Sequence, residues 1–263
     1  MVAANRMKPS PSDSSRGLRL PPQIVACLFD LDGVLTPTAR LHAAAWKRMF
    51  DDVLRARSDG SAAAFVPFDE TDDYLRFVDG KPRADGVRSF LAARGIALPE
   101  GSPTDSAEAE TVHGLGNRKN DLVVALIDEV GVAAYEDAVA FVRAARDVGL
   151  ACAVVSSSAN CRDVLRVAGI ERCFDVVVDG VVAAEQHLRG KPAPDTFLAA
   201  AAALGVEAAA AAVFEDAEAG VEAGRAGGFG LVVGVDRVGR AAVLRRCGAD
   251  VVVPDLGALL EAS

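Results

Sequence analysis

Two aspartates, Asp30 and Asp32, stand one residue apart directly after the short apolar run 24–29. Held close together, two carboxylates repel each other, so they need a cation or must share a proton. A hard dication with oxygen ligands meets this need, and Mg²⁺ is the usual one where a phosphate completes the coordination shell. For a lone pair of aspartates, the alternative is that the side chains cap a turn or the following helix.

Other polar residues follow apolar runs in the same way. Ser156 comes after the run 150–155, and the pair Glu215 and Asp216 comes after the run 211–214. In open α/β sheets, ligands bind at the carboxyl ends of parallel strands, so we expect these side chains and the first two aspartates to converge on one crevice. Each has a simpler alternative, because the serine could cap a helix and the acidic pair could belong to a charged loop.

The apolar runs themselves predict a sheet. They are short and apolar on both faces, which is typical of parallel strands buried between helices, and they span 24–29, 150–155, 174–178, 211–214, 231–235 and 250–253. Helical patterns at 137–148, 160–168 and 195–204 each stop at a glycine, the common residue just past a helix end. Strands that alternate with helices predict an α/β fold with a doubly wound parallel sheet.

The stretch 38–133 interrupts this alternation. It has no comparable apolar run, and its helix-like segments lie at 40–56, 69–78, 85–94 and 119–130, with a polar loop at 99–112. We therefore predict a helical cap domain at 38–133, inserted after the first strand of a core that comprises 23–37 and 134–263. Residues 1–22, rich in proline, serine and charge, are predicted to be a disordered tail.

The composition limits the classes of partner. The 263 residues carry a formal net charge of −9, which argues against nucleic acid, because binding a phosphate backbone needs a basic surface. No apolar run approaches the roughly 20 residues of a membrane span, and the N-terminal segment lacks the apolar stretch of a secretory signal. The five cysteines match neither a zinc site nor a disulfide framework. We expect a cytoplasmic monomer with reduced thiols and no membrane partner.

The run 29–36 (FDLDGVLT) resembles motif I of the haloacid dehalogenase superfamily, whose members mostly transfer phosphoryl groups. Ser156, Lys191 within GKPAPD, and the pair Glu215 and Asp216 resemble motifs II, III and IV in the superfamily's order. The resemblance extends over 24–255. Taken alone, the lysine could equally be a solvated surface residue.

This resemblance implies a role for each motif residue. Asp30 would attack phosphorus and become an aspartyl phosphate, and Asp32 would protonate the leaving oxygen and later deprotonate the incoming one. Ser156 would donate a hydrogen bond to the transferring phosphoryl group, and Lys191 would supply positive charge against it. The implied Mg²⁺ ligands are Asp30, the backbone carbonyl of Asp32, Glu215 and Asp216.

The segment 38–46 (TARLHAAAW) resembles the β-phosphoglucomutase-like subfamily, which has Thr, His and Trp in this pattern. Arg83 matches an arginine that grips the second phosphate of the substrate, and the run 118–121 matches one whose lysine and asparagine reach the sugar. The run 156–160 (SSSAN) is similar to the subfamily's Ser-Ala-Ser-Lys-Asn, but Ala159 replaces the lysine and removes one cation. The substrate-binding residues implied are Thr38, His42, Trp46, Arg83, Lys119, Asn120, Ser157, Ser158 and Asn160.

Simpler roles exist for three of these residues. His42 could be a packed helix residue, Trp46 could belong to the core of the cap, and Arg83 could be a surface arginine. His42 and Trp46 are four residues apart, so a helix would place them on one face in either case.

Two functions follow from the resemblance. One is a mutase that converts β-glucose 1-phosphate to glucose 6-phosphate through glucose 1,6-bisphosphate. The alternative is a phosphatase that uses the same residues on sugar phosphates or similar small phosphoesters. A non-catalytic regulator is disfavoured by the intact acidic set, and a dehalogenase is disfavoured because that chemistry needs no Mg²⁺ site.

Overall fold

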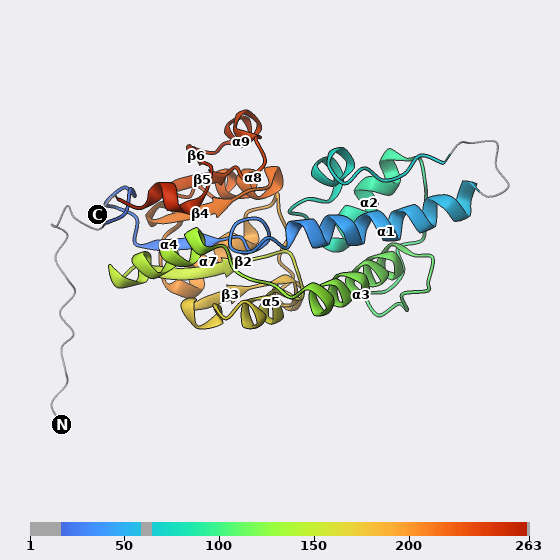
Figure 1. Ribbon diagram of the computed structural model, residues 1–263, viewed down its shortest axis with the longest axis horizontal. Coiled ribbons are helices and arrows are strands. Elements are labelled where there is room, and N and C mark those ends of the chain that lie inside the picture. The colour runs from blue at the N-terminus through green and yellow to red at the C-terminus, as the bar shows by residue number, and fades with distance from the viewer. Residues whose placement is uncertain (1–16, 59–64, 262–263) are drawn as a thin grey trace, which may run out of the picture.

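The computed structural model describes residues 17–58 and 65–261, and Figure 1 shows its two parts side by side. Strands and their flanking helices form one part, and the first and last described residues, Gly17 and Glu261, lie together at its far end. The helices that follow the first strand form the other part. The order of elements is one strand, then helices, and then the other five strands with the remaining helices.

A single sheet of six parallel strands runs in the order β3-β2-β1-β4-β5-β6. The strands are β1 (Ala26–Phe29), β2 (Ala151–Val155), β3 (Val176–Val178), β4 (Ala211–Glu215), β5 (Leu231–Val235) and β6 (Val251–Val253). Phe29 of β1 pairs with Val154 on one side and Phe214 on the other, so the strand that precedes the first aspartate lies at the centre. All six predicted strands are present.

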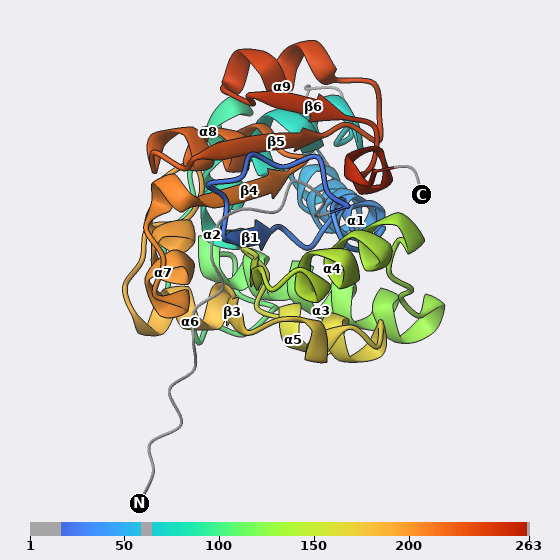
Figure 2. The same cartoon turned by 90° about the vertical axis from the view of Figure 1, so that its left-hand side faces the viewer.

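Helices cover both faces of the sheet, as Figure 2 shows. On one face, α4 (Glu136–Asp147), α5 (Cys161–Val167) and the short η4 (Leu256–Leu259) pack against Phe29 and Phe214. On the other face lie α7 (Asp195–Leu204), α8 (Glu218–Ala226) and α9 (Ala241–Cys247). The short elements η2 (Glu171–Cys173), α6 (Gly180–Glu185) and η3 (Ala208–Ala210) complete the connections. The predicted doubly wound architecture is confirmed.

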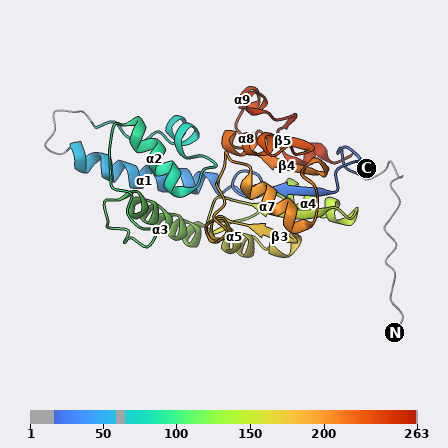
Figure 3. The ribbon, with the colours of Figure 1, turned by 180° about the vertical axis from the view of Figure 1, so that it is seen from behind.

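The helices between β1 and α4 form their own cluster of aromatic side chains. They are α1 (Ala39–Ser58), the π-helical turn η1 (Tyr74–Val78), α2 (Arg83–Ala93) and α3 (Val112–Val130), seen from behind in Figure 3. Phe50 lies at the centre of this cluster, with its ring centroid 4.1 Å from that of Phe90 and 5.2 Å from that of Trp46. We call residues 39–58 and 65–130 the helical unit, because this cluster is separate from those of the sheet.

Three predicted boundaries were wrong. The helix-like segment predicted at 69–78 is the shorter π-helical turn η1 (Tyr74–Val78). The helix predicted at 119–130 begins at Val112, because the Thr111 side chain accepts a hydrogen bond from the Gly114 N–H and so caps a turn whose glycines weaken the helical pattern. The tail predicted at 1–22 ends earlier, because Leu18 is buried and the Arg19 N–H donates to the Leu259 carbonyl. Residues 1–16 lie outside the described part of the chain.

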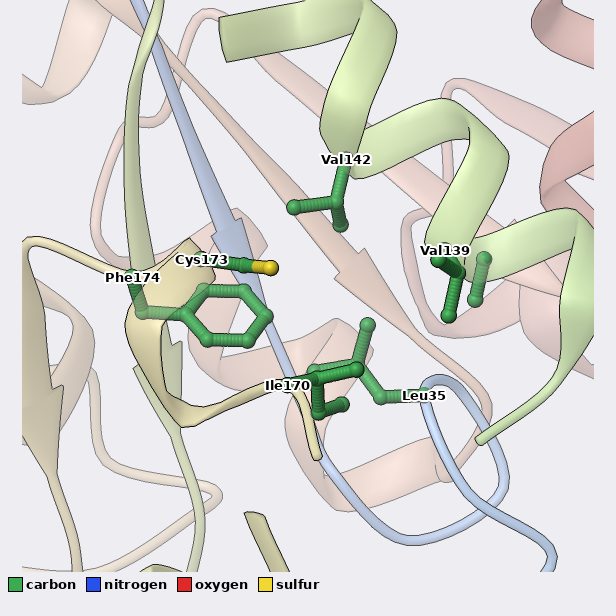
Figure 4. Close-up of a pocket in the computed structure, with 7 residues that line it drawn as sticks. Leu35, Val139, Val142, Ile170, Cys173 and Phe174 are labelled. Atoms are coloured by element: carbon green, nitrogen blue, oxygen red, sulfur yellow. The ribbon is translucent and has the colours of Figure 1, made fainter. Parts of the chain in front are cut away.

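A small hollow under α4 belongs to the packing of the core. Figure 4 shows Val139 and Val142 of α4 facing Ile170, Phe174 and Leu35 across it. Its lining is apolar apart from one thiol, so it offers no groups for chemistry. All five cysteines are free thiols. Among the helices of the described residues, none is long and apolar enough to cross a membrane.

Candidate active site

A cavity of about 350 Å³ lies where the carboxyl ends of the central strands meet the helical unit. Asp30 follows β1, Ser156 follows β2, and Asp216 follows the last residue of β4. The opposite wall comes from α1, the segment after η1, α2 and α3. Segments far apart in the sequence therefore contribute to one site, as the strand-end argument predicted.

Three carboxylates gather at the floor of this cavity. Asp30, Glu215 and Asp216 each offer an oxygen, and these oxygens lie within 4.8 Å of one another. Lys191 Nζ lies 2.5 Å from both Asp30 Oδ1 and Glu215 Oε1, and it also donates to the Val155 carbonyl at 3.0 Å. One ammonium cannot balance three carboxylates, and this oxygen-rich set fits a hard divalent cation.

The pKa values of the cluster report this excess of negative charge. Burial, partly offset by Lys191, raises the pKa of Asp30 to about 6 and that of Glu215 to about 7. Burial and the neighbouring Asp79 carboxylate raise the pKa of Asp216 well above its ordinary value. Although burial opposes its charge, Asp30 and Glu215 hold the pKa of Lys191 above its usual range, so the lysine stays protonated.

The turn after β1 leaves no room for a side chain at Gly33. Its φ is +93°, a conformation that favours glycine, and a Cβ built there would lie 1.8 Å from Asp216 Oδ2. The close approach of this turn to β4 therefore brings the first aspartates against the acidic pair.

Asp32 sits beside the carboxylate cluster and has different partners. The Thr38 hydroxyl donates to Asp32 Oδ1, and His42 Nε2 lies 3.6 Å from the same oxygen. Burial raises the pKa of Asp32, while the hydrogen bond from Thr38 opposes the rise. A carboxyl group with a raised pKa and an open side toward the cavity is suited to carrying a proton.

His42 and Lys119 form a buried pair next to this aspartate. Lys119 Nζ lies 3.0 Å from His42 Nδ1, and whenever Lys119 is an ammonium it can only donate, so the imidazole then carries its proton on Nε2. That Nε2 finds no hydrogen-bond partner among the described residues. Burial lowers the pKa of Lys119 to about 7, and burial together with Lys119 lowers the pKa of His42 well below 6.5. The nearest acceptor to this buried donor is Asp32 Oδ1, 3.6 Å away.

The serine-rich loop after β2 joins the sheet to the helical unit. Ser156 is buried, and its Oγ accepts a hydrogen bond from the Ser158 N–H at 3.1 Å. The Ser157 hydroxyl donates to the Gly80 carbonyl at 2.8 Å, and Asn160 Nδ2 donates to Asn120 Oδ1 at 3.0 Å. Two hydrogen bonds thus connect this loop to opposite sides of the cavity wall.

The structure brings nearly all of the predicted substrate-binding residues to this cavity. Those in its wall are His42, Trp46, Arg83, Lys119, Asn120, Ser157, Ser158 and Asn160, together with Ala159. Thr38 is the exception, because it is fully buried and lies behind Asp32 rather than in the wall. The stem of Arg83 packs against Gly116 of α3, where a Cβ would lie 3.1 Å from its Cγ.

Sequence reasoning missed several residues in the cavity wall, among them Asp79 and Tyr74. Burial and the Glu215 carboxylate raise the pKa of Asp79 to about 7, although a hydrogen bond from the Tyr74 hydroxyl opposes the rise. Nothing in its spacing marks Asp79, since it follows a helical turn rather than a strand. Only the fold brings it to the end of the sheet.

Comparison with known proteins gives a consistent set of relatives. The family model for haloacid dehalogenase-like hydrolases matches residues 24–228. The β-phosphoglucomutase of Mycobacterium tuberculosis (strain CDC 1551 / Oshkosh) is 56% identical over 261 residues, which cover 98% of this chain and 100% of that protein. The β-phosphoglucomutase of Bacillus subtilis (strain 168) is 33% identical over 80% of this chain and 82% of its own length.

Among solved structures, a β-phosphoglucomutase from Clostridium difficile has a similar fold. The two structures share 27% sequence identity and a TM-score of 0.68, and the match covers 90% of this chain and 93% of that one. The similarity therefore covers most of the chain and includes the α/β fold of the sheet.

Proposed function

The chain belongs to the family of haloacid dehalogenase-like hydrolases, and on that premise we propose that it is a Mg²⁺-dependent β-phosphoglucomutase. The observation that carries the proposal is a single cavity with Asp30 at its floor, bonded to the buried Lys191, and Arg83 in the opposite wall. A mutase needs both, since it must hold one phosphate at the nucleophile and the other at a second anion site. The 56% identity to a β-phosphoglucomutase supports the same reaction.

The proposed reaction passes one phosphoryl group through Asp30. Phosphorylated Asp30 donates its phosphoryl group to the 6-hydroxyl of β-glucose 1-phosphate, while Asp32 takes the hydroxyl proton. The resulting β-glucose 1,6-bisphosphate reverses its orientation in the site, and Asp30 then attacks the phosphorus at position 1. Asp32 returns the proton to the leaving oxygen, which releases glucose 6-phosphate and restores the phosphoenzyme. The half-buried position of Asp32, with a hydrogen bond from Thr38, supports this role in proton transfer.

Carboxylates of the floor would hold the metal. Asp30, Glu215, Asp216 and the backbone carbonyl of Asp32 would be the ligands, and Lys191, bonded to Asp30 and Glu215, would lie beside them. When bound, Mg²⁺ supplies positive charge that offsets the negative charge of the carboxylates and of the phosphoryl oxygens. Lys191 adds a fixed positive charge, and Ser156 offers a hydrogen-bond donor to the same oxygens.

We propose that residues 38–133 act as a cap over a core of 23–37 and 134–263. The hydrogen bonds from Ser157 to Gly80 and from Asn160 to Asn120 would hold the cap against the core. A closed cap keeps water from the aspartyl phosphate until a sugar hydroxyl is in place. We also expect a monomer that acts on a phosphorylated sugar in the cytoplasm.

The alternative is a phosphatase, and one feature of the site favours it. Ala159 stands in the cavity wall where the resemblance leads us to expect a lysine, so the site has one cation fewer for holding a bisphosphate. Weaker binding of the bisphosphate would favour hydrolysis of the aspartyl phosphate on Asp30 over transfer to a sugar hydroxyl.

One assay separates the two functions. The purified enzyme is given β-glucose 1-phosphate, Mg²⁺ and a trace of glucose 1,6-bisphosphate, and glucose 6-phosphate and inorganic phosphate are followed together. A mutase gives glucose 6-phosphate in large excess over inorganic phosphate. Inorganic phosphate without glucose 6-phosphate would reject the mutase and leave the phosphatase.

A further inference from the structure

Arg237, in the segment after β5, makes an unusual set of contacts. Its Nε donates to the Gly33 carbonyl at 3.1 Å, and its Nη2 donates to the Val34 carbonyl at 3.3 Å and to Asp137 Oδ2 at 2.7 Å. The guanidinium carbon lies 3.7 Å from the ring centroid of Tyr135. The side chain is 18% exposed, so these contacts form in a largely desolvated position.

The groups that Arg237 contacts belong to both connections between the core and the helical unit. Gly33 and Val34 lie on the connection from β1 to α1, and Tyr135 lies at the end of the connection from α3 to α4. The Tyr135 N–H also donates to the Leu35 carbonyl at 2.9 Å. The two connections therefore meet at one guanidinium.

We propose that Arg237 is a positioning residue that fixes the turn after Asp32 and ties it to the second connection, so that the Asp32 carboxyl group keeps its place beside Asp30. This inference rests on the proposed function, because it assigns Arg237 an effect on a reaction in which Asp32 transfers protons. Neither the motifs nor the cavity wall includes Arg237, and it acts only through the backbone carbonyls that it binds.

The close packing of the turn after Asp32 explains why a residue that fixes its position would affect the reaction rate. Gly33 approaches Asp216 so closely that a methyl group would not fit, so a small shift of the turn changes the spacing of the acidic residues. A misplacement of about 1 Å can cost about a hundredfold in rate. Lysine could not replace this function in full, because a single ammonium lacks the planar fork that reaches two carbonyls and a carboxylate at once.

The chain offers a matched control in Arg94 of the helical unit. Its guanidinium donates to the carbonyls of Val66 and Pro67 and to Asp73 Oδ2, it lies 5.0 Å from the ring of Phe90, and its side chain is 21% exposed. Arg94 thus makes the same kinds of contact as Arg237, but the carbonyls that it binds, of Val66 and Pro67, do not belong to the turn after Asp32. Replacing either arginine should cost similar stability.

The test compares Arg237→Gln, Arg237→Lys and Arg94→Gln in the full chain at 25 °C, with circular dichroism to verify folding. We expect Arg237→Gln to lower kcat about ten- to a hundredfold with little change in KM, and to raise the phosphate released per glucose 6-phosphate. Arg237→Lys should restore part of kcat. Arg94→Gln should lower the melting temperature about as much as Arg237→Gln does, and keep kcat within about twofold.

Two results would overturn the inference. One is an Arg237→Gln enzyme that folds and matches the wild type in kcat and phosphate release. The other is an equal loss of kcat in Arg94→Gln, since that would trace the effect to stability. A wild-type enzyme without phosphoryl transfer would instead reject the proposed function, so the two failures can be told apart.

Discussion

At the scale of residues, the site is dominated by carboxylates whose charge is incompletely balanced. Five of them have raised pKa values, mainly because of burial: Asp30, Asp32, Asp79, Glu215 and Asp216. Lys191 is the cation bonded directly to this group, and it contacts two of its members. Without a bound cation, the repulsion among these carboxylates destabilises the folded state. Such an arrangement is typical of sites that bind metal and phosphate.

A pH dependence of stability follows from this arrangement. A carboxyl group whose pKa is higher in the folded state than in the unfolded chain stabilises the fold as the pH falls and destabilises it as the pH rises. The ordinary pKa of Glu215 is 4.5, and its raised value is about 7. Between pH 4.5 and about 6, we therefore expect the free energy of unfolding of the metal-free protein to decrease as the pH rises. The lowered pKa of His42 makes the free energy of unfolding rise with pH, but this is the effect of one group against that of five carboxyl groups.

Urea unfolding at several pH values, with and without Mg²⁺, measures this effect. Saturating Mg²⁺ should flatten the decrease, because bound metal replaces protons as the source of positive charge and stabilises only the folded state. A free energy of unfolding that rises through this window in the metal-free protein would contradict the electrostatic description of the site.

A second prediction at this scale concerns Arg83, the expected anchor of the second phosphate. Replacing it with alanine removes charge-assisted hydrogen bonds worth about 1.5–3 kcal/mol, so KM for β-glucose 1-phosphate should rise about ten- to a hundredfold. Arg88→Ala on the same helix is the control, because that side chain is half exposed and pairs with Asp85 and Glu100. Equal KM values for the two variants would contradict a role of Arg83 in substrate binding.

At the scale of elements, the turn between β1 and α1 is the most constrained segment of the site. The Gly33→Ala variant should lose its Mg²⁺-dependent activity, because the new methyl group would displace the Asp216 carboxylate. Gly149→Ala is a matched control: Gly149 also has a positive φ, of +81°, but a Cβ there meets nothing within 4 Å. Both variants should lose about 1–3 kcal/mol from backbone strain.

Isothermal titration with Mg²⁺, together with the activity assay, distinguishes the two glycine variants. Only Gly33→Ala should bind Mg²⁺ more weakly than the wild type. If Gly149→Ala weakened Mg²⁺ binding to the same extent, backbone strain rather than the contact with Asp216 would be the cause.

The elements that could be predicted from the sequence are those with strong local signals. Runs such as 150–155 are too short and too apolar for anything but buried strands, and glycines such as Gly205, with a φ of +71°, mark the helix ends. The start of α3 was missed because Gly114 and Gly116 weaken its pattern. Asp79 and Arg237 were missed because their importance arises from tertiary contacts, which no local spacing reveals.

At the scale of the whole molecule, the site lies between two separately packed parts. The sheet has clusters of apolar residues on both of its faces, and the helical unit has one of its own. Contacts such as the one between Asn160 and Asn120 join the two parts across the cavity. A substrate that binds both walls would therefore favour a closed arrangement of the parts.

Trp46 offers a direct readout of this closure, since it is the only tryptophan in the chain and lies in the cavity wall. Lys119 Nζ lies 4.8 Å from the centre of its ring. We expect glucose 6-phosphate to change the tryptophan emission with saturation, and glucose without phosphate to leave it unchanged. An emission spectrum that does not respond to saturating glucose 6-phosphate would contradict closure around the sugar phosphate.

The central claim is that Asp30 carries the phosphoryl group between substrates. The enzyme is incubated with Mg²⁺ and glucose 1,6-bisphosphate, quenched in acid and digested, and the peptides are analysed by mass spectrometry. We expect one phosphoryl group on Asp30, removable by hydroxylamine as expected of an acyl phosphate, and none on the Asp30→Asn variant. A phosphoryl group on another residue, or an unmodified Asp30 in an enzyme that turns over, would contradict it.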